Sequence, residues 1–229
     1  MGLTIALTTV ELGDCLRYFL TNEEKHAGVM WAAIMAYQYL SGARISEVLA
    51  LKRRQICAEN GTLHPYFKRT KLKTGKSRSE HTVRIDPACE VAQVVQRWME
   101  ESRRRYARLS VDEWAFACGF RDKPVRRDNA WKAYQRAYKF LGIDYVSRGT
   151  HAIRKTAGEV QYDINRQASG DGFRAVQQVQ NFYSHATSAN TEKYLRIKPG
   201  AETEIARQHG ECVRIKTSTA DVQNDLADN

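Results

Sequence analysis

The chain has 229 residues, of which 42% are hydrophobic and 27% are charged, and its formal net charge is +10. This length supports one well-formed core, or at most two small domains, and the composition is that of a soluble globular protein. No window approaches the roughly 18 continuous apolar residues of a membrane span, so we expect no membrane partner. The N-terminal stretch lacks a basic start followed by an apolar run, which excludes a signal peptide.

The positive charge is concentrated in the middle of the chain. Residues 52–84 contain ten Lys or Arg against two acidic residues, and residues 121–139 contain seven against two. Residues 201–229 reverse the balance, with six acidic residues and three basic ones. A basic face of this kind suits a polyanion such as nucleic acid, although net charge alone fits a merely soluble basic protein equally well.

The five cysteines are scattered, odd in number and free of any C-x-x-C pair. This pattern argues against a zinc site or a disulfide framework and indicates a reducing, cytoplasmic compartment. We also find no carboxylate cluster that would bind a metal ion.

Helices are predicted along most of the chain. Thr8 and Glu11 have the spacing of a capping box ahead of an amphipathic stretch, which predicts a first helix. A strongly apolar and therefore buried helix fits residues 27–40, Ser41-Gly42 ends it, and a short helix follows over residues 44–51. A further helix opens at Pro87 and runs to about residue 106, with Val91, Val94, Val95 and Trp98 facing inward. The remaining helices fit residues 129–141, 150–165, 173–182 and 190–195.

One segment has a different pattern. Residues 63–72 and 80–85 flank the sequence Thr74-Gly75-Lys76-Ser77, which predicts a β-hairpin with a basic tip. The expected fold is thus a mostly α-helical domain with one small antiparallel sheet (α+β), over residues 1–200. Residues 201–229 form a separate tail, in which residues 202–216 fit one more helix and the last dozen residues have the composition of a disordered end.

Four clusters of polar residues could carry chemistry. In the first, Ser41-Gly42 precedes Arg44, and Glu47 follows at helical spacing, so a guanidinium could be held rigidly for a phosphate. A plain ion pair between Arg44 and Glu47 explains the same sequence motif. In the second, His151 and Arg154 share one face of a helix and would point at one ligand, although a basic surface helix is the simpler alternative.

The third cluster is His185 with Tyr194 nine residues later, and its simpler alternative is an ordinary half-buried aromatic. His81 and Arg84 repeat the His-x-x-Arg spacing, but in a predicted strand, where residues three apart face opposite sides. We therefore discount that pair. The fourth cluster is the hairpin tip, where a lysine could reach a phosphate or remain part of a solvated turn. The lysines of the tip are Lys71, Lys73 and Lys76.

The order of the four clusters is more specific than any one of them. It resembles the tyrosine recombinase (phage integrase) family, whose motifs read approximately G-x-R-x-x-E, K-x-G, H-x-x-R and G-H…Y. The resemblance covers roughly residues 8–196. Lys73 fits the hairpin lysine best, because Lys73-Thr74-Gly75 has the K-T-G form, and Lys71 and Lys76 remain alternatives. Carried over residue by residue, the catalytic positions are Arg44, Lys73, His151, Arg154, His185 and Tyr194.

The resemblance implies a site-specific recombinase that cleaves and rejoins DNA through a bond between Tyr194 and the 3′-phosphate. Arg44 and Arg154 would bind the phosphate, His151 would accept the tyrosine proton, His185 would donate to a non-bridging oxygen and Lys73 would protonate the departing 5′-oxygen. No metal or cofactor is required. The implied partners are double-stranded DNA and further copies of the chain, assembled on DNA as a tetramer. The implied location is the cytoplasm of a bacterial cell, in association with the nucleoid, for a gene of the cell, a phage or a plasmid.

Two positions depart from the family pattern. Ser184 stands where the family usually has Gly before the second histidine, and Lys155 follows Arg154 where His or Arg is usual. Only 43 residues precede Arg44, too few for the N-terminal DNA-gripping domain of full-length relatives. We therefore expect an isolated catalytic domain or a naturally short member. Residues 202–216 are expected to dock on a neighbouring protomer.

Two alternatives remain open from sequence. A type IB topoisomerase uses the same chemistry to relax DNA without exchanging partners, and the spacing from His185 to Tyr194 favours a recombinase. A DNA-binding regulator without cleavage would suit the basic middle segment equally, and the presence of all six candidate positions argues against it.

Overall fold

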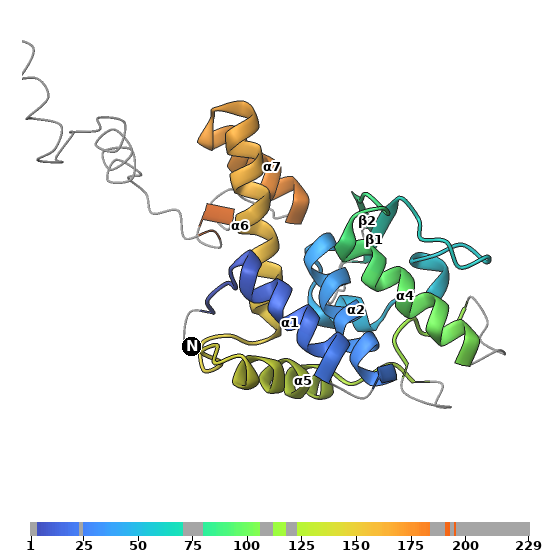
Figure 1. The fold of residues 1–229 in the computed structure, drawn as a ribbon. Coiled ribbons are helices and arrows are strands. Elements are labelled where there is room, and N and C mark those ends of the chain that lie inside the picture. The colour runs from blue at the N-terminus through green and yellow to red at the C-terminus, as the bar shows by residue number, and fades with distance from the viewer. Residues whose placement is uncertain are drawn as a thin grey trace, which may run out of the picture.

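Helix α2 (Lys25–Ser41) is the axis around which the other elements pack (Figure 1). The computed structural model describes residues 4–22, 25–70, 80–105, 112–117, 123–183, 191–192 and 195. Every residue from Val29 to Gln38 is buried, so α2 is enclosed on all sides. Helices α1 (Thr9–Asn22), α4 (Glu90–Arg105) and α6 (Thr150–Ser169) contact it. The prediction of a buried helix over residues 27–40 is confirmed.

Helix α1 begins at the predicted capping box. The Thr8 amide donates to Glu11 Oε2 at 2.8 Å, and the Glu11 amide donates to Thr8 Oγ1 at 3.1 Å. These two bonds satisfy amide groups that a helix start otherwise leaves without a partner. The apolar side of α1 then packs into the core through Leu12, Cys15, Leu16 and Phe19.

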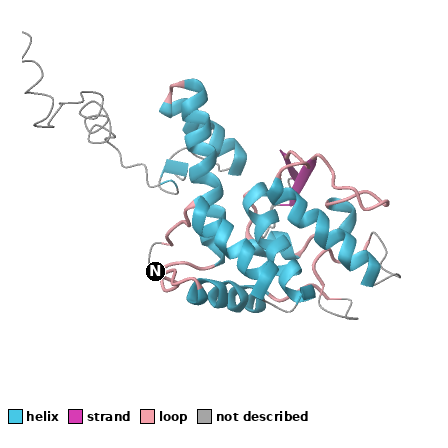
Figure 2. Ribbon diagram, viewed as in Figure 1, coloured by secondary structure: helices cyan, strands magenta, loops and turns pink. Residues whose placement is uncertain are grey.

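The predicted hairpin is present as strands β1 (Tyr66–Thr70) and β2 (Glu80–Arg84), which pair antiparallel with Phe67 opposite Val83 (Figure 2). Phe67 is fully buried and its ring stacks on that of Tyr37 in α2, with centroids 4.1 Å apart. The hairpin is therefore fixed on the central helix. The domain is mostly helical with this small sheet, as the sequence predicts. The tip, residues 71–79, which includes Lys73, lies outside the described residues.

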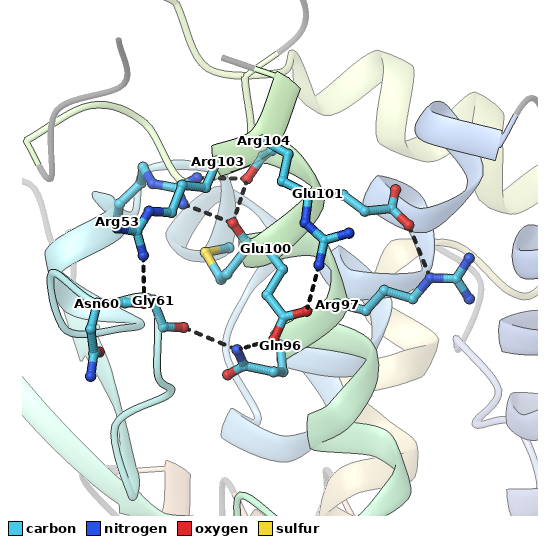
Figure 3. A network of polar contacts seen from close by, with 11 residues as sticks. Arg53, Asn60, Gly61, Gln96, Arg97, Glu100, Glu101, Arg103 and Arg104 are labelled. Atoms are coloured by element: carbon cyan, nitrogen blue, oxygen red, sulfur yellow. Dashed lines mark hydrogen bonds and ion pairs between the residues drawn. The ribbon is translucent and has the colours of Figure 1, made fainter. Parts of the chain in front are cut away.

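The loop that leads into the hairpin is held on α4 by a polar network (Figure 3). Arg103 donates to the Asn60 carbonyl at 2.5 Å and Gln96 donates to the Gly61 carbonyl at 3.1 Å. Beneath them, the buried guanidinium of Arg53, in the 3-10 helix η1 (Arg53–Gln55), donates to Ser102 Oγ at 2.7 Å. Gln96 also accepts from the Leu63 amide at 3.0 Å, so the network extends to the base of the hairpin.

Helix α4 begins later than the sequence predicts. We expected Pro87 at its first position, but the helix starts at Glu90. The reason is a separate turn, in which Asp86 accepts from the amide groups of both Ala88 and Cys89. Val95 and Trp98 face the core as expected, and Ala92 and Met99 join them. Val91 and Val94, the other two predicted inward residues, are only partly buried.

Three further helices follow. Helix α5 (Arg127–Phe140) packs beside α1, and α6 and α7 (Gly172–Tyr183) pair as a hairpin that extends to one side (Figure 1). Helix α6 runs past its predicted end at residue 165 because its cap is Gly170, whose φ of 66° lies in the left-handed region. Thr191, Glu192 and Leu195 are helical within the predicted helix 190–195. The rest of that stretch and residues 196–229, including the tail helix 202–216, lie outside the described residues.

Helices α6 and α7 pack closely at Gly158. A Cβ placed there would lie 2.6 Å from Tyr183 Cε2 and 2.8 Å from Tyr183 Cζ, and Tyr183 is 1% exposed. These distances are below van der Waals contact, and a buried ring has little freedom to move. The α6–α7 spacing therefore requires glycine at this position.

We predict that Gly158→Ala destabilises the protein by about 1–3 kcal/mol, since the added methyl group overpacks the Tyr183 contact. Gly13→Ala is the matched control, because Gly13 lies inside α1 and a Cβ there meets nothing within 4 Å. That control should stabilise the protein by about 0.5–1 kcal/mol through helix propensity. Urea unfolding measures both. Equal effects in the two variants would contradict the packing argument.

Candidate functional site

Arg44 lies at the turn between α2 and α3 (Ile45–Leu49). Gly42 makes this turn with a φ of 60°. The Arg44 amide donates to Glu47 Oε2 at 2.8 Å, and Arg44 Nη1 pairs with Glu47 Oε1 at 2.9 Å. The Glu47 side chain is only 3% exposed, whereas that of Arg44 is 49% exposed. The ion pair foreseen as the simpler alternative is therefore present, and it holds one side of a guanidinium that still faces solvent.

Arg154 is buried beside the same turn. It is 1% exposed, and its Nη1 donates to the carbonyl of Gly42, two residues before Arg44. Its Cζ lies 4.3 Å from the centroid of the Tyr183 ring, a cation–π distance. The two predicted phosphate-binding arginines thus meet at one place, although 110 residues separate them in the sequence.

His151 occupies the first turn of α6, and α2 fixes this helix end. The buried amide of Gln38 donates to the carbonyl of Thr150 at 2.8 Å, and Tyr134 donates to the other atom of that amide, Oε1, at 3.3 Å. The backbone next to His151 is therefore fixed to the central helix by a buried hydrogen bond. Its position one turn before Arg154 on α6 agrees with the predicted shared face.

The pKa of His151 is lowered from 6.5 to about 4. His151 is exposed, yet the protein around the ring removes enough water to disfavour the charged form, which is the largest cause. The positive charges of Arg154 and Arg44 are the next causes, followed by Lys155 and Arg127. His151 is consequently neutral near pH 7 and able to accept a proton.

The remaining predicted site residues, Lys73, His185 and Tyr194, lie outside the described residues. Their sequence neighbours are described. Tyr183, two residues before His185, lies against Arg154, and Leu195, next to Tyr194, packs in one apolar cluster with Tyr183. The described part of the chain therefore brings Arg44, His151 and Arg154 together.

Sequence reasoning missed Tyr183 and the role of its neighbours Gly42 and Gly158. Tyr183 is one of 11 tyrosines, and nothing in its spacing distinguishes it. Gly42 was recognised as part of the Arg44 motif, but the hydrogen bond from Arg154 to its carbonyl was not predicted. The only available signal for Tyr183 was its place directly before Ser184-His185.

Lys155, which departs from the family pattern, is directed toward the N-terminal segment. It is buried, and its Nζ donates to the carbonyl of Thr4 at 3.0 Å. The next residue, Thr156, accepts from the Leu7 amide and donates to the Leu7 carbonyl, both at 2.9 Å. The segment ahead of α1 is thereby fixed along the helix that carries His151 and Arg154.

Among the described residues, no group of three or more His, Cys, Asp or Glu side chains is placed to hold a metal ion. Within the same residues, every helix is too short or too polar to span a bilayer.

The lowered pKa of His151 generates a prediction. The unfolded chain binds this proton near pH 6.5 and the folded chain near pH 4, so stability is lost as the pH falls through this window. We expect an NMR titration midpoint for the His151 ring near pH 4. Arg44→Ala should raise this midpoint, because it removes a positive charge. Arg54→Ala is the matched control, since Arg54 pairs with Asp112 and does not contribute to the shift.

An NMR titration midpoint near pH 6.5 for the His151 ring of the native protein would contradict its placement among these cations. As a second check, His151→Asn should flatten the dependence of the urea midpoint on pH between 4 and 6.5, because the titrating group is gone.

Most of the chain is similar to one known protein family. Residues 14–200 match the Phage integrase family. Tyrosine recombinase XerC of Lactobacillus delbrueckii subsp. bulgaricus is 24% identical over 199 residues, which cover 87% of this chain and 60% of XerC.

Two solved structures have the same fold. The XerH site-specific recombinase bound to a palindromic difH substrate matches with a TM-score of 0.63 and 20% identity, over 89% of this chain and 53% of XerH. XerA recombinase matches with a TM-score of 0.62 and 17% identity, over 90% of this chain and 66% of XerA. This chain thus spans about 60% of the length of XerC and about half of that of XerH. It belongs to the phage integrase family and has the fold of a tyrosine recombinase catalytic domain.

Proposed function

We propose that the protein is a site-specific DNA recombinase that cleaves and rejoins strands through a 3′-phosphotyrosine intermediate. The observation that carries this proposal is the convergence of Arg44 and Arg154 on His151, whose pKa is lowered to about 4, first by loss of water around the ring and then by their positive charges. Two fixed guanidinium groups suit a phosphodiester, whose negative charge repels nucleophiles until it is neutralised. A neutral imidazole at the same place suits removal of a proton from a hydroxyl group.

In the proposed reaction the Tyr194 oxygen attacks the phosphorus atom and the bond from phosphorus to the 5′-oxygen breaks. His151 takes the tyrosine proton, and Lys73 gives a proton to the departing 5′-oxygen. Arg44, Arg154 and His185 stabilise the charge on the non-bridging oxygens. The phosphotyrosine link conserves the energy of the broken bond, so a 5′-hydroxyl of another strand reverses the step without ATP.

The proposed DNA-binding face includes the start of α5. Arg126 is exposed with its side chain at 81%, and Arg127 contributes to the positive potential at His151. Lys132 and Lys139 continue the basic surface along the same helix. These charges support binding to the phosphates that flank the reacting one, a contact that fixes position without reading sequence.

Double-stranded DNA and further copies of the chain are the proposed partners. The solved relatives include XerH bound to difH and a lambda integrase dimer bound to a COC′ core site. By analogy we propose a tetramer on two DNA sites, with residues 202–216 docked on a neighbouring protomer, in the cytoplasm of a bacterial cell. Truncation after Ile197 should then weaken assembly on DNA.

Relaxation of DNA in the manner of a type IB topoisomerase, and DNA binding without cleavage, are less well supported. The family match and the XerC and XerH relatives are all recombinases or integrases. A single-site plasmid relaxed without any recombinant product would favour the topoisomerase.

The nucleophile is testable by covalent trapping. Duplex pools with random sequence and a nick are incubated with the protein, which is then denatured, and DNA bound to protein is recovered and sequenced. Cleavage near the nick releases a short fragment that carries the 5′-hydroxyl. This fragment diffuses away, so religation fails and the adduct accumulates. We expect adducts with the native chain and none with Tyr194→Phe, because the attacking oxygen is gone.

The matched control is Tyr18→Phe, since Tyr18 lies on α1 against Phe140, away from the arginines. It should form adducts at the native rate. Adducts that survive Tyr194→Phe would show that another residue is the nucleophile.

A further inference from the structure

Tyr183, the last residue of α7, contacts Arg154 through two different groups. Its ring lies 4.3 Å from the guanidinium carbon, and its hydroxyl donates to the backbone carbonyl of Arg154. We propose that Tyr183 is a positioning residue that orients the Arg154 guanidinium toward the scissile phosphate, an inference that rests on the proposed function.

The place of the Tyr183 ring is set from two sides by glycines. A Cβ on Gly158 of α6 would lie 2.6 Å from Cε2 of the ring, and a Cβ on Gly42 would lie 2.7 Å from Cζ of Phe182 and 2.9 Å from Cε1 of Tyr183. Side chains at either position would displace the ring. The ring is therefore fixed between two backbones that belong to different elements, one of which also supplies a carbonyl to Arg154.

The two contacts on the guanidinium restrain different motions. A cation that lies over an aromatic face is attracted to that face, and most strongly where the pair is shielded from water, so the ring restrains movement of the guanidinium away from it. The hydrogen bond from Nη1 to the Gly42 carbonyl then restrains rotation of the guanidinium. Neither the ring nor the carbonyl neutralises the positive charge, so both orient Arg154 without weakening its attraction to a phosphate.

Tyr183 also connects Arg154 to the segment that carries the other proposed catalytic groups. It precedes His185 by two residues, and it shares an apolar cluster with Val179 and Leu195, the residue next to Tyr194. A shift of the ring would consequently disturb Arg154 together with the packing of Leu195. Misplacement by about 1 Å can cost about 100-fold in rate.

The test compares two substitutions. Tyr183→Phe keeps the ring and should form the covalent adduct within about threefold of the native rate at saturating DNA. Tyr183→Leu removes the ring and should lower that rate about 10- to 100-fold, while the Kd for DNA changes less than about threefold. Tyr183→Met, whose longer and unbranched side chain adapts to the space without a ring, replaces the leucine variant if thermal unfolding shows that the latter is not folded.

A second substrate separates positioning from general damage to the fold. Methylphosphonate at the scissile position carries no negative charge, so orientation of a cation matters less there. The defect of Tyr183→Leu should shrink to less than about threefold on this substrate. Equal defects on both substrates, or no defect on either, would overturn the inference.

An NMR measurement without DNA keeps the inference independent of the reaction. The Tyr183 ring current should shift the Arg154 side-chain protons upfield in the native chain and in Tyr183→Phe, and this shift should vanish in Tyr183→Leu. Absence of the shift from the native chain would overturn the inference. Failure of the native chain to form any adduct, with the shift present, would instead count against the proposed function.

Discussion

The burial of one positive charge determines how the candidate site is built. Arg154 is almost fully enclosed, and an enclosed guanidinium is costly unless its hydrogen-bonding groups and its charge are satisfied. Two contacts that offset part of this cost come from distant parts of the chain, namely the Gly42 carbonyl at the end of α2 and the Tyr183 ring at the end of α7. The folded state in which Arg154 is tolerated is therefore the one in which these three elements meet.

The apolar central helix makes that meeting possible. Because α2 is buried on all sides, its end at Ser41 has a fixed place, and the turn that carries Gly42 and Arg44 is fixed with it. The buried side chain of Gln38 also fixes the start of α6, because it donates a hydrogen bond to the Thr150 carbonyl. Packing therefore holds these groups in fixed places, as the proposed reaction would require.

Local patterns predicted most of the elements because their causes are local. The capping box at Thr8 and Glu11, the apolar run of α2 and the alternation in the hairpin each act over a few residues. The predicted helix start at Pro87 was wrong, because Asp86 forms a turn with the residues that follow it. The pairing of Arg154 with Gly42 and Tyr183 could not be predicted from the chain, because backbone carbonyls leave no trace in side-chain spacing and the partners lie 112 and 29 residues away.

The same two arginines that suit a phosphate also act on His151, the proposed proton acceptor. In the free protein the loss of water around the ring, together with the charges of these arginines, holds the pKa of His151 down to about 4 and keeps it neutral. A phosphodiester bound between Arg44 and Arg154 would oppose their field with its own negative charge, and the pKa of His151 would rise toward its ordinary value. A base of higher pKa takes a proton more readily, so binding of the phosphate would strengthen the base at the moment it is needed. In the proposed function, the clustering of cations around one histidine would thus couple occupancy of the site to the reactivity of His151.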